Sequence, residues 1–206
     1  MKKVFLITLF ILIIDQAFKI WVKLHFTLGE EVPVIGNWFR LYFTENNGMA
    51  FGMELGGNTG KLILSVFRIM AVAGILIYLF YLTGKVEKRT GLIISTSLIF
   101  AGAIGNIIDS AFYGMLFTES TYHTVATWAT GDLQGYAPFL HGKVVDMLYF
   151  PIVNIPKEEA PQWFPDFLFG PDNRFIFFRP IFNIADASIT VGVFWLLLFE
   201  RKYLHI

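Results

Sequence analysis

Four long apolar stretches alternate with polar connections along the chain. Each has about the 20 residues that a helix needs to cross the roughly 30 Å hydrocarbon core of a bilayer. The stretches are approximately 4–24, 62–83, 91–113 and 180–199. The pattern predicts a membrane all-α bundle of four transmembrane helices, with residues 1–206 in a single membrane domain.

The composition agrees with a membrane protein and excludes several kinds of site. Hydrophobic residues make up 55% of the chain and charged residues only 16%, a profile typical of membrane proteins. The absence of cysteine excludes disulfides, Cys-ligated zinc and a thiol nucleophile. A formal net charge of zero gives no indication of nucleic-acid binding.

The first apolar stretch resembles a signal peptide because Lys2 and Lys3 precede it. However, Asp15 and Lys19 interrupt its apolar run, and no small-x-small cleavage site follows. We therefore expect a retained transmembrane span.

Basic residues in the short segments that flank the predicted spans indicate the orientation of the bundle. They are Lys2, Lys3, Lys85, Lys88, Arg89, Arg201 and Lys202. With four spans they all fall on one side, which the positive-inside rule assigns to the cytoplasm. Both termini are then cytoplasmic, and the two longer segments, 25–61 and 114–179, lie outside.

The two outer segments contain short patterns typical of strands. Residues 38–44 have aromatic and β-branched composition, and 45–48 are typical of a turn. Residues 141–150 alternate like a strand, with 174–178 as the expected partner. Five prolines from Pro151 to Pro171 exclude a long helix between them. Several aromatic side chains would suit a small sheet at the headgroup level. They are Trp38, Phe39, Tyr149, Trp163, Phe164 and Phe167.

Three of the four predicted spans carry polar pairs that lipid would not tolerate. The pairs, each three or four residues apart, are Asp15 with Lys19, Asn106 with Asp109, and Asn183 with Asp186. Such spacing places both side chains on one helix face. An Asp at the centre of a membrane helix costs about 2.5–3.5 kcal/mol on insertion scales, so we expect these faces to point into the bundle.

Asp146 lies in the second outer segment with apolar neighbours on both sides. If this segment folds back onto the helix ends, Asp146 can meet Asp186 near the outer membrane surface. Two carboxyls in one low-dielectric site share a proton, because both cannot ionise easily. The charged member can take a proton from water while the neutral member donates a hydrogen bond to a carbonyl under attack. This is the chemistry of an aspartic protease.

Five motifs in order carry a resemblance to a known family. They are DQAFK at 15–19, NNGMAF at 46–51, GAIGNIID at 102–109, GKVVD at 142–146 and FNIAD at 182–186. With these motifs and four spans, the chain resembles the lipoprotein signal peptidases, or signal peptidases II, which are membrane aspartic proteases of bacteria. The resemblance implies four transmembrane helices with a small extracytoplasmic β-sheet cradle and a short outer helix.

The resemblance also implies a site and a substrate. Asp146 and Asp186 stand at the positions of the catalytic dyad. Residues that shape the site or hold substrate are expected at Asp15, Lys19, Asn46, Gly48, Asn106, Asp109 and Asn183. The expected substrates are diacylglyceryl-modified prolipoproteins, cleaved before the lipidated cysteine at the outer face of the bacterial inner membrane.

The remaining partner expectations are contact with membrane lipid and a monomeric enzyme without metal, cofactor or nucleic acid. The resemblance adds inhibition by cyclic peptides of the globomycin type.

The chain departs from the family pattern at three places. Ser110 stands where the family commonly has Arg, so Lys143 or Arg179 would have to supply that charge. Met147 replaces a usual aromatic, and residues 122–138 and 155–173 look like insertions.

Other interpretations remain open on the residues alone. Asp15 and Lys19 could be only an internal ion pair, and Asn106 and Asp109 could only cap or cross-link helices. Acids inside a bundle also mark ion pathways, so a small transporter or proton channel is an alternative, as is a membrane scaffold. Serine-type and presenilin-like proteases are disfavoured because G-x-S-G and G-x-G-D are absent.

Overall fold

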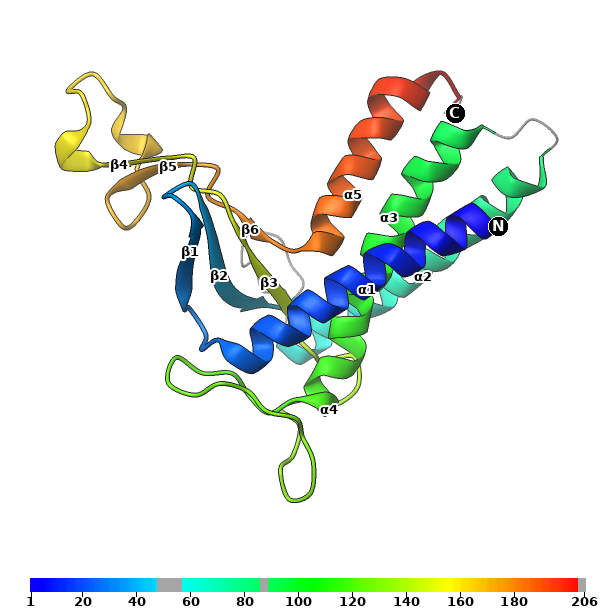
Figure 1. Cartoon of the computed structure of the whole chain (residues 1–206), viewed down its shortest axis with the longest axis horizontal. Coiled ribbons are helices and arrows are strands. Elements are labelled where there is room, and N and C mark those ends of the chain that lie inside the picture. The colour runs from blue at the N-terminus through cyan, green and yellow to red at the C-terminus, as the bar shows by residue number, and fades with distance from the viewer. Residues whose placement is uncertain (48–56, 86–88, 204–206) are drawn as a thin grey trace.

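The computed structural model of the chain describes residues 1–47, 57–85 and 89–203. Its long helices are α1 (Lys2–His25), α2 (Gly57–Gly84), α3 (Thr90–Ile108) and α5 (Ile184–Trp195). They run side by side, and the N- and C-terminal ends of the chain lie at the same end of this group of helices (Figure 1).

Two of the helices continue in other helical forms. A π-helical turn, η2 (Asp109–Tyr113), and the short α4 (Gly114–Leu116) follow α3. In the same way η5 (Leu196–Glu200), a π-helix, and η6 (Arg201–Tyr203), a 3₁₀ turn, follow α5. Short π-helical turns inside α-helices are frequent at functional sites, and η2 begins at Asp109, one of the predicted site residues.

The first three predicted apolar stretches agree with observed helices, but the fourth begins later than predicted. Residues 180–183 precede α5: Ile181 and Phe182 form strand β6, and Asn183 caps the helix in an extended conformation. The apolar pattern could not place this boundary, because Ile181 and Phe182 suit a strand as well as a helix.

The surfaces of the helices are apolar where they face away from their neighbours. Phe10 on α1, Ile77 on α2 and Leu198 on η5 are each more than half exposed. Within the described residues, three helical stretches are long and apolar enough to cross a membrane: Lys2–His25, Thr59–Gly84 and Thr90–Leu116. Large exposed apolar surfaces of this kind suit lipid rather than water.

A four-stranded antiparallel sheet packs beside the C-terminal half of α1. Its order is β1-β2-β3-β6. The strands are β1 (Glu31–Ile35), β2 (Phe39–Asn46), β3 (Val144–Tyr149) and β6 (Ile181–Phe182). The central pair, β2 and β3, joins the two outer segments, and β6 leads directly into α5. The sheet thus links three distant parts of the sequence (Figure 1).

A separate hairpin of β4 (Val153–Pro156) and β5 (Arg174–Phe177) projects from this sheet. The predicted pairing of 174–178 with 141–150 is therefore wrong: β5 pairs with β4, while β3 pairs with β2 and β6. The predicted turn at 45–48 is also wrong in its first half, because Glu45 and Asn46 belong to β2. Alternation identifies strands but leaves their partners undetermined.

The short outer helix implied by the resemblance is not seen as a separate α-helix in the described parts of the outer segments. After η2, these parts contain only the three residues of α4 and two 3₁₀ turns, Lys157–Glu159 and Asp166–Leu168. Pro161 and Pro171 follow the two 3₁₀ turns, and because a proline disfavours helical backbone at the residue before it, neither turn continues as a longer helix.

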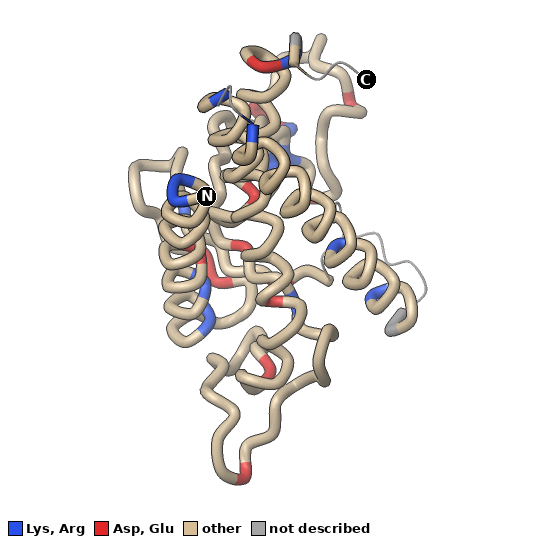
Figure 2. Tube along the Cα trace, turned by 90° about the vertical axis from the view of Figure 1, so that its right-hand side faces the viewer, with Lys and Arg blue, Asp and Glu red and all other residues tan. Residues whose placement is uncertain are grey.

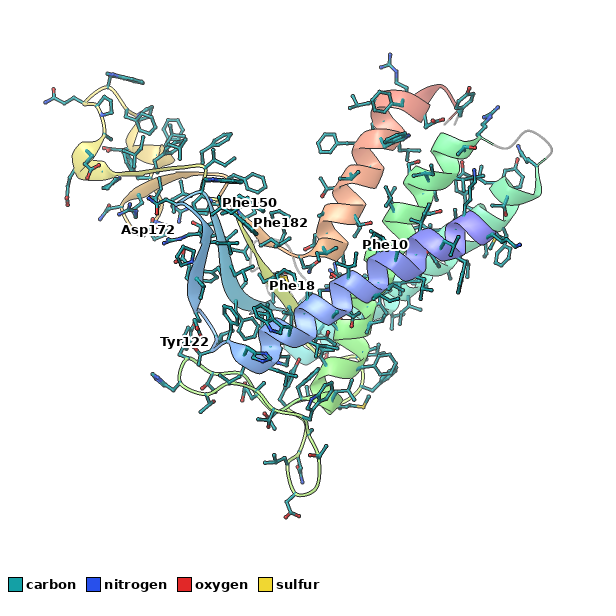
Figure 3. All side chains as sticks on the ribbon, viewed as in Figure 1. Phe10, Phe18, Tyr122, Phe150, Asp172 and Phe182 are labelled. Carbon is teal, nitrogen blue, oxygen red and sulfur yellow. The ribbon has the colours of Figure 1, made fainter. Side chains whose placement is uncertain are left out.

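The apolar core beside the sheet lies between one face of the sheet and the ends of α1 and α3. It contains Val22, Phe26, Leu41, Phe43, Tyr113, Phe117, Val145 and Met147. At the other edge of the sheet, Phe150 stacks between Phe39 and Phe182, at centroid distances of 4.7 and 5.7 Å. Phe150 and Phe182 lie together beside the start of α5 in Figure 3. Trp163 and Phe167, in the connection between β4 and β5 (residues 157–173, the hairpin arm), are strongly exposed, and their location at the headgroup level stays a prediction.

The helices α3 and α5 approach each other closely because glycine faces the contact on both sides. A Cβ on Gly102 would overlap the carbonyl oxygen of Ala185 and lie 2.7 Å from Cγ1 of Ile189. A Cβ on Gly192 would lie 2.7 Å from the carbonyl oxygen of Ser95. Small residues at helix interfaces allow such backbone contact in membrane proteins. This contact holds the start of α5 against the end of α3.

We expect Gly102→Ala to lower the free energy of unfolding by about 1–3 kcal/mol, because the added methyl group overpacks the contact between α3 and α5. Thermal unfolding of the purified protein in detergent measures the effect. The matched control is Gly74→Ala on α2, where an added Cβ meets no atom within 4 Å. Equal melting temperatures for the two variants would contradict the close contact.

Candidate active site

Asn183 joins three elements at the start of α5. Its Oδ1 accepts a hydrogen bond from the backbone N–H of Asp186 at 2.8 Å, which is an N-cap. Its Nδ2 donates to Oδ1 of Asp146 at 2.7 Å and to Oδ1 of Asn106 at 3.1 Å. The side chain is completely buried. One amide therefore fixes the first turn of α5 relative to β3 and α3.

Asn106 on α3 connects the buried ammonium group of Lys19 to Asp186. Its Oδ1 accepts hydrogen bonds from Nζ of Lys19 at 2.9 Å and from Asn183. Both are donors, so the opposite side of the amide, Nδ2, must face Asp186, and it donates to Oδ1 of that residue at 2.7 Å. Asp186 is only half-buried, in contrast to Asp146. Asn106 thus orients the carboxyl group of Asp186 from the side of α3.

Asp146 lies on β3 opposite Thr44 of β2. Asn46, two residues further along β2, is its diagonal neighbour on the same face and donates from Nδ2 to Oδ2 of Asp146. Burial, together with the negative charge of Asp186, raises the pKa of Asp146 to about 7, against the opposing effects of Lys19 and the two amides. The pair Asp146 and Asp186 therefore keeps one proton near neutral pH.

A buried ion cluster lies beneath this pair. Nζ of Lys19 lies 3.0 Å from Oδ2 of Asp15 and 2.8 Å from Oδ2 of Asp109, and all three side chains are fully buried. The predicted ion pair of Asp15 and Lys19 is confirmed, with Asp109 as a third member. Asp15 also accepts a hydrogen bond from the backbone N–H of Ala185 at 2.8 Å, where the helix dipole of α5 favours negative charge.

The cluster also positions β3 and includes a residue that was not predicted. Oδ2 of Asp109 accepts a hydrogen bond from the backbone N–H of Val145, next to Asp146, at 3.2 Å. Nε2 of Gln16 donates to Oδ1 of Asp109 at 2.9 Å and to Oδ2 of Asp15 at 3.1 Å. The position of Gln16 directly after Asp15 and three residues before Lys19 was the sequence signal that could have identified it as a site residue.

The structure brings eight of the nine predicted site residues into one connected network. The ninth, Gly48, lies outside the described residues. Ser110 is buried and donates a hydrogen bond to the carbonyl of Asn106 at 3.0 Å. The two alternative sources of positive charge form ion pairs elsewhere. Lys143 pairs with Glu45 and Glu119, and Arg179 pairs with Asp172.

In the described part of the chain, no group of three or more His, Asp or Glu side chains could hold a metal ion. What the arrangement offers is two carboxyl groups with different burial, oriented by three asparagines. Such a pair can hold and transfer a proton.

The fold is similar to that of two solved membrane enzymes. Two structures described as bacterial membrane enzymes align with TM-scores of 0.60 and 0.58, at 23% and 25% identity. The alignments cover 100% and 96% of this chain and 91% and 92% of theirs. The fold is therefore that of a membrane enzyme.

The family is shown by sequence. The family described as signal peptidase (SPase) II matches residues 7–201. The lipoprotein signal peptidase of Porphyromonas gingivalis is 42% identical over 196 residues, covering 95% of this chain and 81% of the relative. That of Amoebophilus asiaticus is 33% identical over 197 residues, covering 95% and 76%. The chain belongs to the signal peptidase II family and is a peptidase, as the resemblance implied, which decides against the transporter and scaffold alternatives.

We expect Lys19→Met to lower the free energy of unfolding by about 3–5 kcal/mol, because it leaves the buried carboxylates of Asp15 and Asp109 without their cation. Thermal unfolding in detergent measures the loss. The control is Lys157→Met, which removes an ion pair of similar length, 2.8 Å, from the exposed hairpin arm. Exposed pairs contribute little, so this variant should match the wild type. A stable Lys19→Met protein would contradict the ion cluster.

Proposed function

We propose that Asp146 and Asp186 are the catalytic pair of this signal peptidase. As a member of the signal peptidase II family, the chain removes signal peptides from prolipoproteins. The observation that carries the catalytic assignment is the amide bridge: Asn183 and Asn106 connect the two carboxyl groups through hydrogen bonds of 2.7–3.1 Å. The electrostatic effect of Asp186 on Asp146 supports their closeness.

The chemistry follows from one proton shared by two carboxyl groups. The ionised carboxylate removes a proton from water, and the water oxygen attacks the carbonyl carbon of the scissile peptide. The protonated carboxyl donates a hydrogen bond to the carbonyl oxygen as it gains negative charge. When the C–N bond breaks, the leaving nitrogen takes up a proton from the pair, which returns to its starting state. Asp186, the more exposed member, is accessible to water.

The site lies away from the two chain ends. Asp186 is in the first turn of α5, Asn106 is in the last turn of α3, and Asp15 is beyond the middle of α1. Basic residues stand beside the N-terminus, and charged residues reappear only in the C-terminal half of α1 (Figure 2). This supports cytoplasmic termini and a site toward the outer face of the inner membrane. In this arrangement α5 with η5 is the fourth transmembrane span, and the sheet is the outer cradle.

The proposed substrate is a prolipoprotein whose cysteine already carries diacylglycerol, cleaved just before that cysteine. Further along α5, the helix that carries Asp186 exposes apolar side chains, among them Val191 and Phe194, so acyl chains can remain in lipid while the peptide reaches the pair. Asp15, Lys19, Asn46, Asn106, Asp109 and Asn183, with Gly48, shape this site. A monomer suffices for lateral entry of substrate, and cyclic peptides of the globomycin type should compete for the same site.

We expect Asp146→Asn and Asp186→Asn each to abolish cleavage of a lipidated prolipoprotein peptide, because neither variant can share a proton between two carboxyl groups. The wild type should not cleave the unlipidated peptide. Asp172→Asn is the matched control, an acid of the same outer segment that pairs with Arg179 on the surface. Substantial cleavage by either dyad variant would exclude the proposed pair.

The pH dependence of kcat/KM provides an independent test. Because the pKa of Asp146 is raised to about 7, the singly protonated pair is present below that pH and is lost as the pH rises through it. We expect kcat/KM to fall above about pH 7. The hydrogen bond from Asn46 opposes this rise in pKa, so Asn46→Ala should move the alkaline limb to higher pH. Identical pH profiles for the two proteins would contradict this role of Asn46.

A further inference from the structure

A second buried polar cluster lies behind the sheet, on the face opposite the proposed catalytic pair. Lys23 near the end of α1 is completely buried, and its ammonium pairs with the Glu45 carboxylate, whose side chain is 2% exposed. Nζ of Lys23 also lies 2.9 Å from Oγ of Ser120, which in turn donates to Oε1 of Glu45 at 3.2 Å. A buried ion pair is expensive to form, so its presence calls for a reason.

Strand geometry connects this cluster to the catalytic pair. Successive side chains of a strand point to opposite faces of the sheet. Phe43 and Glu45 of β2 therefore face the core with Val145 and Met147, while Thr44 and Asn46 face Asp146. Glu45 is directly followed by Asn46, whose amide donates to Asp146. Fixing the Glu45 side chain thus fixes the rotation of the strand end that presents Asn46.

We propose that Lys23 and Glu45 are positioning residues, which act through Asn46 to set the orientation of Asp146. The proposal rests on the proposed assignment of Asp146 and Asp186 as the catalytic pair. Neither Lys23 nor Glu45 belongs to the network of Lys19, and they reach Asp146 through the strand rather than by contact.

The long second outer segment covers this cluster, which gives the segment a structural role. Its Tyr136 ring lies 4.9 Å from Nζ of Lys23, and its Ser120 completes the hydrogen bonds of the pair. The hydroxyl of Tyr136 accepts a hydrogen bond from the backbone N–H of Lys143 at 2.7 Å, three residues before Asp146. Lys143 and Glu119 add outer charges, with Nζ of Lys143 3.8 Å from Oε2 of Glu45. Residues 117–143 therefore exclude water from the pair that positions β2.

The decisive variant is Lys23→Met combined with Glu45→Gln, which removes both charges and leaves no unpaired buried charge. We expect kcat for the lipidated peptide to fall about tenfold, because displacements of about 1 Å at a catalytic group cost up to a hundredfold. KM should stay within about twofold, and the alkaline limb should move as in Asn46→Ala. Glu45→Asp, which keeps the charge but shortens the side chain, should show the same changes to a smaller extent and serves if the double variant does not fold.

A double-mutant cycle with Asn46→Ala separates positioning from general destabilisation. If Lys23 and Glu45 act through Asn46, their change adds nothing to the loss of activity in Asn46→Ala. The matched control is Glu31→Gln, which breaks the half-exposed ion pair with Arg40 in the same sheet and should leave kcat unchanged.

Two outcomes would overturn the proposal, and they are distinguishable. Additive losses, or a lower melting temperature with unchanged kcat and pH profile, would show a merely structural role for the pair. Full activity of Asp146→Asn and Asn46→Ala would instead remove the catalytic assignment on which the proposal rests.

Discussion

The ammonium group of Lys19 is the charge on which the arrangement of this site depends. Three helices bring polar side chains into an apolar bundle, where each buried charge needs a partner. Lys19 forms ion pairs with both Asp15 and Asp109, and it also donates to Asn106. Asp15 accepts a hydrogen bond from the backbone of Ala185 at the start of α5, and Asp109 accepts one from the backbone of Val145 on β3. Asn106 donates a hydrogen bond to Asp186. One cation thus fixes the relative positions of α1, α3, α5 and β3.

In this arrangement, the residues that hold the structure together are distinct from the proposed catalytic pair. In the fully buried layer, the carboxylates of Asp15 and Asp109 share the ammonium of Lys19, so this layer is suited to hold the structure. Asp146 and Asp186 lie above it, and the neutral amides of Asn183, Asn46 and Asn106 donate hydrogen bonds to them. Amides orient carboxyl groups without supplying the full charge that would force both to ionise. The proton needed for peptide hydrolysis can therefore remain in the pair.

The two faces of the sheet contact different parts of the protein. One face packs on the end of α1 and includes the apolar cluster around Phe43 and Val145, with Lys23 and Glu45 at its border. The other face presents Asn46 and Asp146 to the start of α5. Strand β6 continues into α5, so the sheet is joined directly to the helix that carries Asp186.

The sequence alone determined the helices, the family and most of the candidate site. Apolar runs of about 20 residues have few alternatives in a bilayer, and acids spaced three or four apart within them must face inward. The tertiary structure decided what depends on distant partners. It paired β5 with β4, extended β2 through Asn46, and started the fourth helix at Ile184. Glu45 and Lys23 looked like ordinary polar residues, because only the folded chain, which brings residues 23, 45 and 120 together, shows that their charges are buried.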